Sequence, residues 1–272
     1  MKNILISGGS SYLGQNLINL LAKNNKVSIY SRDKKNFFII NKNLKFTLIT
    51  NKKELFDKLN NEKFDIYINL ISDSKKIKNL SGLINSLQAN YFLNKQIVNR
   101  MIKSSNVRII QINSYWQLLK TKNRKKFSIY VWGKNKITKY LEMAQKNDVL
   151  DLCILYLGDV YGEKDYRNKL IPSLLKNLNL KINNRSGLFF PTYIKDVSKA
   201  VEAIILNNLD SGKYYLFDEY LYVKDVVEIM SKLPQIHQEL PKKEIDKFLN
   251  LQSLNLVKFN KVSFSENISK IF

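Results

Sequence analysis

The sequence predicts an α/β fold in which a doubly wound parallel sheet is followed by a small C-terminal α/β lobe. An apolar stretch at residues 1–7 runs directly into a turn with three glycines and then into a helix. Segments with strand and helix patterns then alternate up to residue 157. Such alternation requires a parallel sheet covered by helices on both faces. At 272 residues, the chain is long enough for one such Rossmann-type core with an appended lobe.

The first part of the chain contains the expected sheet. Short apolar runs such as Val27, Ile29 and Tyr30 indicate strands, and longer segments with apolar residues three or four positions apart indicate helices. The expected strands are residues 1–7, 26–31, 44–50, 64–71, 107–112 and 150–157. The expected helices are residues 13–21, 53–59, 83–103 and 130–145.

Beyond Gly162 the alternation of expected strands and helices becomes less regular. We expect short helices at residues 170–178, 193–206 and 223–233, with one strand near 213–217. We therefore assign residues 1–162 to a nucleotide-binding domain and 163–272 to a small substrate-binding lobe, with a discontinuous boundary. The lobe is expected to pack over the carboxyl edge of the sheet, where ligands of such folds bind.

The turn after the first strand is the most informative motif. It reads Gly8-Gly9-Ser10-Ser11-Tyr12-Leu13-Gly14. A strand, a glycine-rich turn and a helix direct backbone N–H groups and the positive helix end at one point, where a pyrophosphate can bind. Gly8 lets the turn close, and Gly14 lets the helix approach the strand. An ordinary βα turn is the alternative, but the position after the first strand favours nucleotide binding.

Composition excludes several function classes. The net charge is +22, but the basic residues are mostly Lys and are spread over every segment, whereas nucleic-acid-binding proteins cluster Arg with aromatic residues on one face. We therefore expect no nucleic-acid partner, although the charge helps to attract anionic ligands. Cys153 is the single cysteine and lies in an apolar run, so we expect a buried thiol, no disulfide and a reducing compartment.

The scarcity of histidine and the lack of long apolar segments exclude further function classes. His237 is the sole histidine, which argues against a histidine metal cluster and a Ser-His-Asp triad. We expect His237 in a surface loop and no bound metal. No apolar run approaches the roughly 18 residues that span a membrane, and Met1-Lys2 leads directly into the first strand. We therefore expect a cytoplasmic protein with no signal peptide.

The expected catalytic residues follow the fifth strand. Ser114 stands at the carboxyl end of that strand, and Tyr130 and Lys134 open the next helix one turn apart. A carbonyl reductase needs such a set. The tyrosine hydroxyl donates a proton to the carbonyl oxygen, a nearby ammonium lowers the tyrosine pKa from about 10, and a serine hydroxyl holds the carbonyl oxygen.

The spacing alone is not specific. Three other Tyr-x-x-x-Lys pairs occur in this lysine-rich chain: Tyr30/Lys34, Tyr91/Lys95 and Tyr220/Lys224. Only Tyr130/Lys134 follows a strand that ends in serine and also opens a helix. The alternative is that Tyr130 is a packing residue and Lys134 a solvated charge.

These motifs together resemble the extended short-chain dehydrogenase/reductases, the NAD-dependent epimerase/dehydratase family. Residues 65–72 are similar to the family strand Asp-Val-Val-Ile-His-Leu-Ala-Ala, and residues 158–162 resemble its Asn-Val-Tyr-Gly turn. Residues 193–197 resemble its Tyr-Val-x-Asp-Val helix start. Ser11 replaces the middle glycine of the family's Gly-x-x-Gly-x-x-Gly turn. The resemblance implies a nicotinamide cofactor held by Gly8, Ser10, Ser11, Tyr12, Leu13, Gly14, Ser31, Arg32, Leu70, Asn90, Tyr130 and Lys134.

Within the family, Ser114-Tyr115-Trp116-Gln117 and the short gap to Tyr130 look most like CDP-abequose synthase and related 4-reductases of nucleotide-activated 4-keto-6-deoxysugars. Trp116 is either a substrate contact or a core aromatic. The arginine that in the family holds the nucleotide diphosphate is replaced by Phe189 or Phe190, and the acidic residue after the third strand is absent. The expected substrate-binding residues are Ser72, Trp116, Asp159, Arg167, Lys181 and Arg185. The last three would replace the missing arginine in phosphate binding, and the alternative is that Asp165-Tyr166-Arg167 is a solvated turn.

The implied activity is NADPH-dependent reduction of the 4-keto group of a nucleotide sugar, in the biosynthesis of surface polysaccharide or lipopolysaccharide. The alternatives are a 4-epimerase or dehydratase that holds NAD tightly, and a catalytically silent NAD(P)-binding protein. NADPH is preferred because Ser31 stands where an NAD site has an acidic residue, and the neighbouring Arg32 suits a 2′-phosphate. The alternative is that Arg32 pairs with Asp33 in solvent.

We also expect a homodimer. The helices at 83–103 and 130–145 carry more apolar residues than one sheet face needs, and in the family these helices pair with their copies as a four-helix bundle. The residues that suggest this are Leu87, Phe92, Ile97, Ile137 and Leu141. Burial of the same residues in the core explains the pattern nearly as well.

Overall fold

The computed structural model describes residues 1–32, 37, 40–73, 77–104, 106–118, 129–176, 182, 187–207, 209–217 and 220–232. The chain divides into two compact units, Met1–Leu155 with Val201–Gly212 and Tyr156–Ala200 with Lys213–Phe272. The division thus falls at Leu155, whereas the sequence placed it at residue 162. A later segment also returns to the first unit.

A seven-stranded sheet forms the centre of the fold, in the order β10-β6-β5-β4-β1-β2-β3. Its strands are β1 (Asn3–Ser7), β2 (Lys26–Tyr30), β3 (Thr47–Ile49), β4 (Ile66–Asn69), β5 (Val107–Ser114), β6 (Leu150–Leu157) and β10 (Gly212–Tyr215). β1 pairs in parallel with β2 and β4, β2 with β3, and β4 with β5. From β1 the chain adds β2 and β3 on one side and then β4, β5 and β6 on the other. The switch point of this doubly wound fold therefore lies between β1 and β4. The predicted Rossmann-type fold is confirmed.

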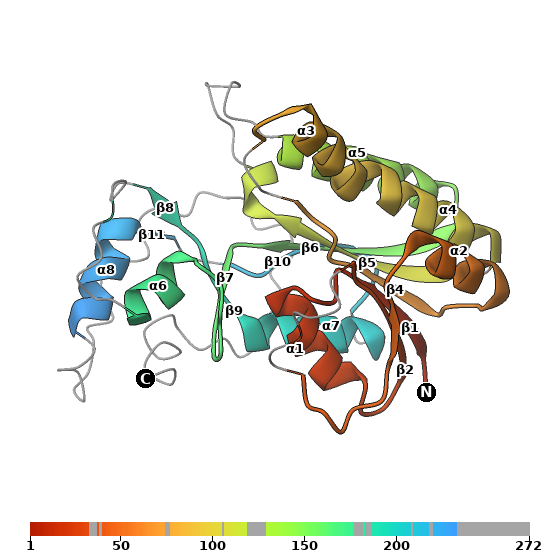
Figure 1. The fold of residues 1–272 in the computed structure, drawn as a ribbon, viewed down its shortest axis with the longest axis horizontal. Helices are drawn as coiled ribbons and strands as arrows, with labels where there is room; N and C mark the ends of the chain where they lie inside the picture. Colours follow the sequence, from red (N-terminus) through yellow and green to blue (C-terminus); the bar gives the residue numbers. More distant parts are fainter. Residues whose placement is uncertain are drawn as a thin grey trace. The chain divides into compact units, whose positions relative to one another are not determined.

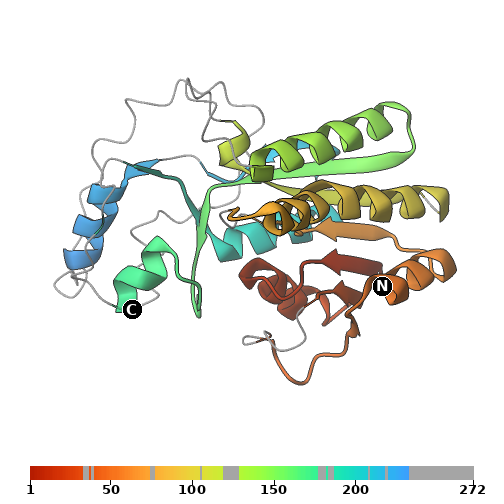
Figure 2. The same cartoon turned by 45° about the horizontal axis from the view of Figure 1, so that its top comes forward.

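Helices cover both faces of this sheet. Those of the first unit are α1 (Tyr12–Leu21), α2 (Lys52–Asn61), α3 (Leu80–Leu87), α4 (Leu93–Ser104) and α5 (Ile129–Lys146). Helix α1 lies on one face, and α2 to α5 lie on the other (Figure 1). Helices α4 and α5 contact each other along the sheet (Figure 2).

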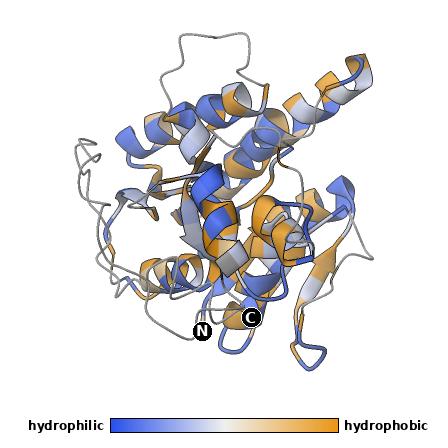
Figure 3. Ribbon diagram, turned by 90° about the vertical axis from the view of Figure 1, so that its left-hand side faces the viewer, coloured by the Kyte–Doolittle hydropathy of each residue, from blue (hydrophilic) through white to orange (hydrophobic). Residues whose placement is uncertain are grey.

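The helices of the first unit are amphipathic, with hydrophobic and hydrophilic residues on different sides (Figure 3). Leu17 and Ile18 of α1, Ile97 of α4, and Ile137 and Leu141 of α5 are fully buried. Burying one such side chain contributes about 1.5–3 kcal/mol relative to leaving it exposed. The core therefore lies between the helices and the two sheet faces.

The long helix predicted at residues 83–103 is present but contains a π-helical turn. This turn, η1 (Gln88–Phe92), lies between α3 and α4, and the backbone is helical on both sides of it. Helix α5 approaches this turn closely at Gly133, which has no side chain. A Cβ atom added there would lie only 2.6 Å from the Asn90 Cβ atom. A π-helical turn inserts one extra residue, and the spacing of apolar residues does not reveal it.

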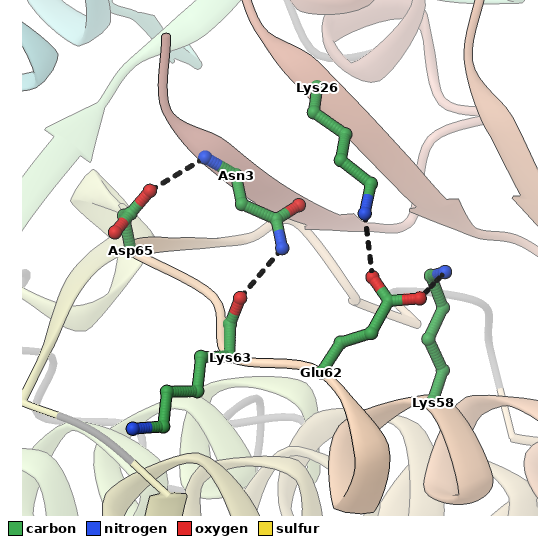
Figure 4. A network of polar contacts seen from close by, with 6 residues as sticks. All are labelled: Asn3, Lys26, Lys58, Glu62, Lys63 and Asp65. Atoms are coloured by element: carbon green, nitrogen blue, oxygen red, sulfur yellow. Dashed lines mark hydrogen bonds and ion pairs between the residues drawn. The ribbon is translucent and has the colours of Figure 1, made fainter.

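Polar contacts fix the amino end of the sheet (Figure 4). The backbone N–H of Asn3 donates to the Asp65 carboxylate at 2.7 Å, and the Asn3 side chain donates to the Lys63 carbonyl oxygen at 2.6 Å. Lys26, at the start of β2, forms an ion pair with Glu62 at 3.0 Å, and Lys58 pairs with the same carboxylate. These contacts join the starts of β1 and β2 to the segment between α2 and β4. They therefore hold the register that places the carboxyl ends of the strands side by side.

The second unit contains more strands than predicted. The sequence indicated one strand after Gly162, but β8, β9 and β11 also follow it: β8 pairs antiparallel with β11, and β9 pairs in parallel with β7, which lies just before Gly162. The elements outside the central sheet are β7 (Asp159–Tyr161), α6 (Leu170–Lys176), β8 (Leu188–Phe189), β9 (Pro191–Tyr193), α7 (Ile194–Ile205), β11 (Leu221–Tyr222) and α8 (Val223–Lys232). Strands of two or three residues are too short to show an alternating pattern.

Candidate active site

The glycine-rich turn leads from β1 into α1 with little room for side chains. Gly8 has a φ of +82°, in the left-handed region that favours glycine. A Cβ on Gly14 would lie 2.7 Å from the carbonyl oxygens of both Gly8 and Gly9, so the helix can approach the turn only with glycine there. Gly9 is equally constrained, since its Cβ would lie 2.1 Å from a methyl carbon of Ile29. The sequence reasoning did not assign a role to Gly9.

Serine side chains fix the shape of this turn. Ser11 is the N-cap of α1, and its hydroxyl accepts a hydrogen bond from the Gly14 N–H at 3.0 Å. Its backbone is extended and unstrained, so serine fits where the family has glycine. The buried Ser31 donates to the Ser10 hydroxyl at 2.9 Å, which joins the end of β2 to the turn.

This turn suits the pyrophosphate of a dinucleotide. The first turn of a helix has N–H groups without partners in the helix, and its dipole favours an anion. Helix α1 has no acidic residue in its first turn to compete with a phosphate. Of the neighbouring predicted contacts, Arg32 is exposed, Leu13 is partly exposed, and the Tyr12 side chain is buried.

The three predicted catalytic residues come together beyond β5. Ser114 ends β5, and Tyr130 and Lys134 lie one turn apart at the start of α5. The Ser114 and Tyr130 side chains lie close enough for Ser114 to influence the pKa of the Tyr130 hydroxyl. Tyr130 is partly exposed, whereas Lys134 is 3% exposed and donates to the Ile112 carbonyl oxygen at 2.8 Å. The alternative that Lys134 is a solvated charge is therefore wrong.

Burial shifts both ionisable groups toward their neutral forms. Loss of solvation lowers the pKa of Lys134 to about 7. Burial raises the pKa of Tyr130, and the interaction with the Ser114 side chain only partly opposes this. The expectation that the Lys134 ammonium lowers the tyrosine pKa is thus wrong for this arrangement. Tyr130 is held as a neutral phenol, which is the form that can donate a proton.

Ser114 is also held by the short helix that follows it, η2 (Tyr115–Gln117). The Gln117 side chain accepts from the Ser114 N–H at 3.1 Å and donates to Asn135 of α5 at 3.0 Å. Trp116 is 50% exposed, so the alternative that it is a core aromatic is wrong. Gln117 was missed as a positioning residue, although a polar side chain three residues after a serine is the signature of a capping box.

The Asn90 side chain forms hydrogen bonds within the protein. The Asn90 side chain accepts from the Asp73 N–H and donates to the Asp73 carbonyl oxygen, both at 2.9 Å. It therefore ties η1 to the segment after β4. Leu70 is buried and Ser72 is exposed in that segment. A second donor bond from Asn90 goes to Ser86 at 3.0 Å.

In the second unit, two of the predicted substrate-binding residues are engaged within the protein. The Asp159 carboxylate accepts from the Phe190 N–H at 3.1 Å. Arg167 forms a two-pronged ion pair with Asp165, at 2.8 and 2.6 Å, and donates to the Val160 carbonyl oxygen at 2.7 Å. The charge of Arg167 is therefore largely balanced. Lys181, Arg185, His237 and Asp33 lie outside the described residues.

Two further properties concern only the part of the chain that the structure describes. Within it, no group of three or more His, Cys, Asp or Glu side chains is arranged to hold a metal ion. None of its helices has the length and apolar character needed to cross a membrane. Cys153 is buried, as expected, and burial raises the pKa of its thiol to about 11.

Comparisons with solved structures show the same fold over nearly the whole chain. UDP-N-acetylglucosamine 4-epimerase of Methanobrevibacter ruminantium, in complex with UDP-N-acetylmuramic acid, is 18% identical with a TM-score of 0.76, covering 99% of this chain and 96% of that one. WbmG of Bordetella bronchiseptica, in complex with NAD and UDP, is 15% identical with a TM-score of 0.77, covering 98% and 92%. dTDP-glucose 4,6-dehydratase of Bacillus anthracis, in complex with NAD, is 14% identical with a TM-score of 0.75, covering 100% and 95%.

A search of curated protein sequences finds no match. The sequence model of the NAD dependent epimerase/dehydratase family matches residues 4–246, which include the glycine-rich turn, Ser114, Tyr130 and Lys134. The chain belongs to the NAD dependent epimerase/dehydratase family.

Proposed function

We propose that this protein reduces the 4-keto group of a nucleotide-activated sugar, with NADPH as the reductant. The observation that carries the proposal is the placement of Ser114 at the end of β5 beside Tyr130, with the buried Lys134 one helical turn away on α5. The glycine-rich turn supplies the helix terminus to which a cofactor pyrophosphate binds. Surface polysaccharide or lipopolysaccharide biosynthesis is the context that we infer for this reaction.

The residues divide the chemistry among them. When bound, NADPH supplies a hydride to the carbonyl carbon of the sugar. Tyr130 donates its phenolic proton to the carbonyl oxygen, which becomes the new hydroxyl group. Ser114 holds that oxygen in place and stabilises the phenolate that Tyr130 leaves behind. Lys134, once protonated, adds a positive charge one turn away and holds the ribose of the cofactor.

The reduction is tested with NADPH and a panel of nucleotide 4-keto-6-deoxysugars that differ in base and sugar. We expect loss of the reduced-nicotinamide absorbance with at least one of them, and one equivalent of reduced sugar for each NADPH consumed. A chain that binds NADPH but consumes none with any sugar of the panel would support the silent binding protein instead.

A second candidate function is 4-epimerisation with tightly held NAD. It is favoured by the similar structures, which include a 4-epimerase and a protein in complex with NAD and UDP. The two functions differ in one observable property. An epimerase interconverts two sugars without net consumption of cofactor, and the purified protein then contains NAD.

Cofactor preference should depend on Arg32. The side chain is exposed at the end of β2, and the neighbouring Ser31 hydroxyl already donates to Ser10. A guanidinium can bind a 2′-phosphate through two N–H groups. Position 31, where an NAD site has the carboxylate that binds the ribose hydroxyls, is a serine here. We expect Arg32→Ala to weaken NADPH binding about tenfold or more and to leave NADH binding within about twofold. Fluorescence titration of both cofactors measures this, and equal binding of the two by the parent would contradict it.

We also propose a homodimer through α3, η1 and α5, on evidence that differs from the first expectation. Ile97, Ile137 and Leu141 are fully buried in the core and are not available to a partner. Phe92, which was among the residues expected at the interface, is 43% exposed. On α3 and α5, four further side chains are 44–70% exposed, namely Leu80, Ile84, Trp132 and Met143. A single Trp132→Glu substitution should therefore produce a monomer, with the thermal midpoint of the parent nearly retained. Light scattering at micromolar concentration measures the mass, and a monomeric parent would contradict the proposal.

A further inference from the structure

A row of buried polar side chains crosses the sheet at its switch point. Ser7 of β1 is in register with Asn69 of β4, and Asn69 is in register with Gln111 of β5. All three are 0% exposed. The residues directly before and after them in these strands are mostly isoleucine and leucine, so the three polar side chains stand out in largely apolar strands. A buried amide is tolerated only when its donors and acceptors have partners.

Both amide groups in the row have such partners. Asn69 donates to the Gln111 side-chain oxygen at 2.7 Å, and its own oxygen accepts from the Ile71 N–H at 3.2 Å and the Ser7 hydroxyl at 3.3 Å. The Gln111 amide donates to the Ile112 carbonyl oxygen and to the Asn113 side chain, each at 3.1 Å. The two amides thereby join the ends of β1, β4 and β5.

Two chains of hydrogen bonds connect Gln111, at one end of the row, to Lys134. The Ile112 carbonyl oxygen accepts both from Gln111 and from the Lys134 ammonium, which lies at 2.8 Å. A carbonyl oxygen has two lone pairs, so the two donors share it. By the second route, Asn113 donates to Thr138 at 3.0 Å, and the Thr138 hydroxyl donates to the Lys134 carbonyl oxygen at 2.7 Å. The side chain and the backbone of Lys134 are both tied to Gln111 in this way.

We propose that Asn69 and Gln111 are positioning residues that hold Lys134 where the reaction needs it, and that they link its position to the end of the strand that carries the glycine-rich turn. This inference rests on the proposed function, in which Lys134 holds the cofactor ribose. The two amides act through Lys134 and through the strand end before Gly8. Neither is assigned a contact with the substrate.

The test is a double-mutant cycle between Gln111 and Lys134. Gln111→Met keeps the length of the side chain and removes its hydrogen bonds. We expect it to weaken NADPH binding about three- to tenfold and to lower kcat about tenfold, because small displacements of catalytic groups cost rate steeply. In a Lys134→Met background, the same change should alter both quantities by less than about twofold, since residues that act as one unit are not additive.

The chain offers a matched control at Asn94. It is 1% exposed, accepts from the Tyr67 hydroxyl at 3.3 Å and donates to the Ala89 carbonyl oxygen at 2.9 Å. Its hydrogen bonds are thus as buried as those of Gln111, and they reach Gln111 only indirectly, through Tyr67, Ser7 and Asn69. Asn94 contacts neither Ile112 nor Lys134 through these hydrogen bonds, so its replacement leaves the contacts between Gln111 and Lys134 in place. Asn94→Leu should lower the thermal midpoint about as much as Gln111→Met while leaving kcat and NADPH binding within about twofold of the parent.

A readout without cofactor separates this proposal from the proposed function. The Lys134 ε-carbon resonance is followed in protein labelled with ¹³C-lysine and is identified by its loss in Lys134→Met. Gln111→Glu keeps the volume and the acceptor for Asn69 but adds a carboxylate beside the shared carbonyl oxygen. We expect this variant to raise the pH midpoint of the Lys134 titration, because a nearby negative charge favours the ammonium. Asn94→Asp should raise it much less.

Two outcomes would overturn the positioning role. The first is a Gln111→Met effect of equal size in the parent and in the Lys134→Met background. The second is a Lys134 resonance that is the same in the parent and in Gln111→Glu. A parent that binds no NADPH and reduces no sugar would overturn the proposed function, while the resonance would still test the link between Gln111 and Lys134.

Discussion

Tyr130→Phe is expected to bind NADPH like the parent and to lose carbonyl reduction by about a hundred- to ten-thousand-fold. The substitution keeps the ring and removes only the hydroxyl, whose pKa is influenced by the neighbouring Ser114 side chain. Burial keeps the phenol protonated by raising its pKa, so the parent enters each turnover with a proton to donate. The measurement is steady-state turnover of a sugar that the parent reduces, together with cofactor titration of both proteins.

The matched control for this prediction is Tyr91→Phe. Tyr91 also precedes a lysine by four residues, and the Lys95 ammonium lies 5.8 Å from its ring centroid. The pair lies on η1 and α4 and does not follow a strand that ends in serine. Tyr91→Phe should keep the turnover of the parent. Near-normal turnover by Tyr130→Phe would show instead that Tyr130 is a packing residue.

Lys134→Met is expected to damage both function and cofactor binding while making the fold more stable. Turnover should fall at least about a hundredfold, because the variant lacks the charge that stabilises the phenolate, and NADPH binding should weaken. Lys134 is 3% exposed, and the hydrogen bond of its ammonium goes to a neutral carbonyl oxygen. Replacing such a buried charge by an apolar side chain of similar volume is often stabilising. We expect a rise in Tm of at least about 2 °C by calorimetry.

The pH dependence of stability gives the same prediction with a definite sign. The pKa of Lys134 is about 7 in the folded chain and about 10.4 when unfolded. Between these values the unfolded chain binds more protons, so the parent becomes more stable as the pH rises from about 7 toward 10. Lys134→Met should lack this contribution. Urea unfolding of both proteins at about pH 7 and about pH 9 measures the difference, and parallel changes in the two would contradict it.

Much of the fold was predictable because its strongest signals are local. The run of apolar residues in β6 and the alternation around β1, α1 and β2 indicated the sheet, and Gly8 and Gly14 marked the turn. The interruption at η1 and the short strands of the second unit were not predictable in this way. A π-helical turn depends on packing against Gly133, and strands of two residues depend on partners far away in the sequence.

The site was predictable in its residue types and less so in its electrostatics. Two sequence signals predicted that the three residues lie near each other: Ser114 at a strand end, and the Tyr-x-x-x-Lys spacing at the start of the next helix. Burial of Lys134 is a tertiary property, so the lowered pKa of this lysine and the raised pKa of Tyr130 could not be predicted from spacing. The ion pair of Arg167 with Asp165 was not itself predicted. The sequence offered a solvated turn at residues 165–167 as the alternative to phosphate binding, and spacing alone does not show that two charged side chains two positions apart pair with each other.

Gln111 did carry a signal in the sequence. It stands between Ile110 and Ile112 in a strand that is otherwise apolar, and Asn69 ends another such strand. A polar residue inside a buried strand requires a partner, and parallel strands place such residues side by side at one edge of the sheet. The partner itself could be identified only from the register between β4 and β5.

The most direct test of the account is transfer of label from NADPH deuterated at the reactive position of the nicotinamide. With a nucleotide 4-keto sugar that the parent consumes, we predict one deuterium at C4 of the sugar product for each NADPH oxidised, measured by mass spectrometry and NMR. The Tyr130→Phe variant should give almost none. A sugar that changes configuration with no deuterium gained and no NADPH consumed would contradict the reductase and identify an epimerase.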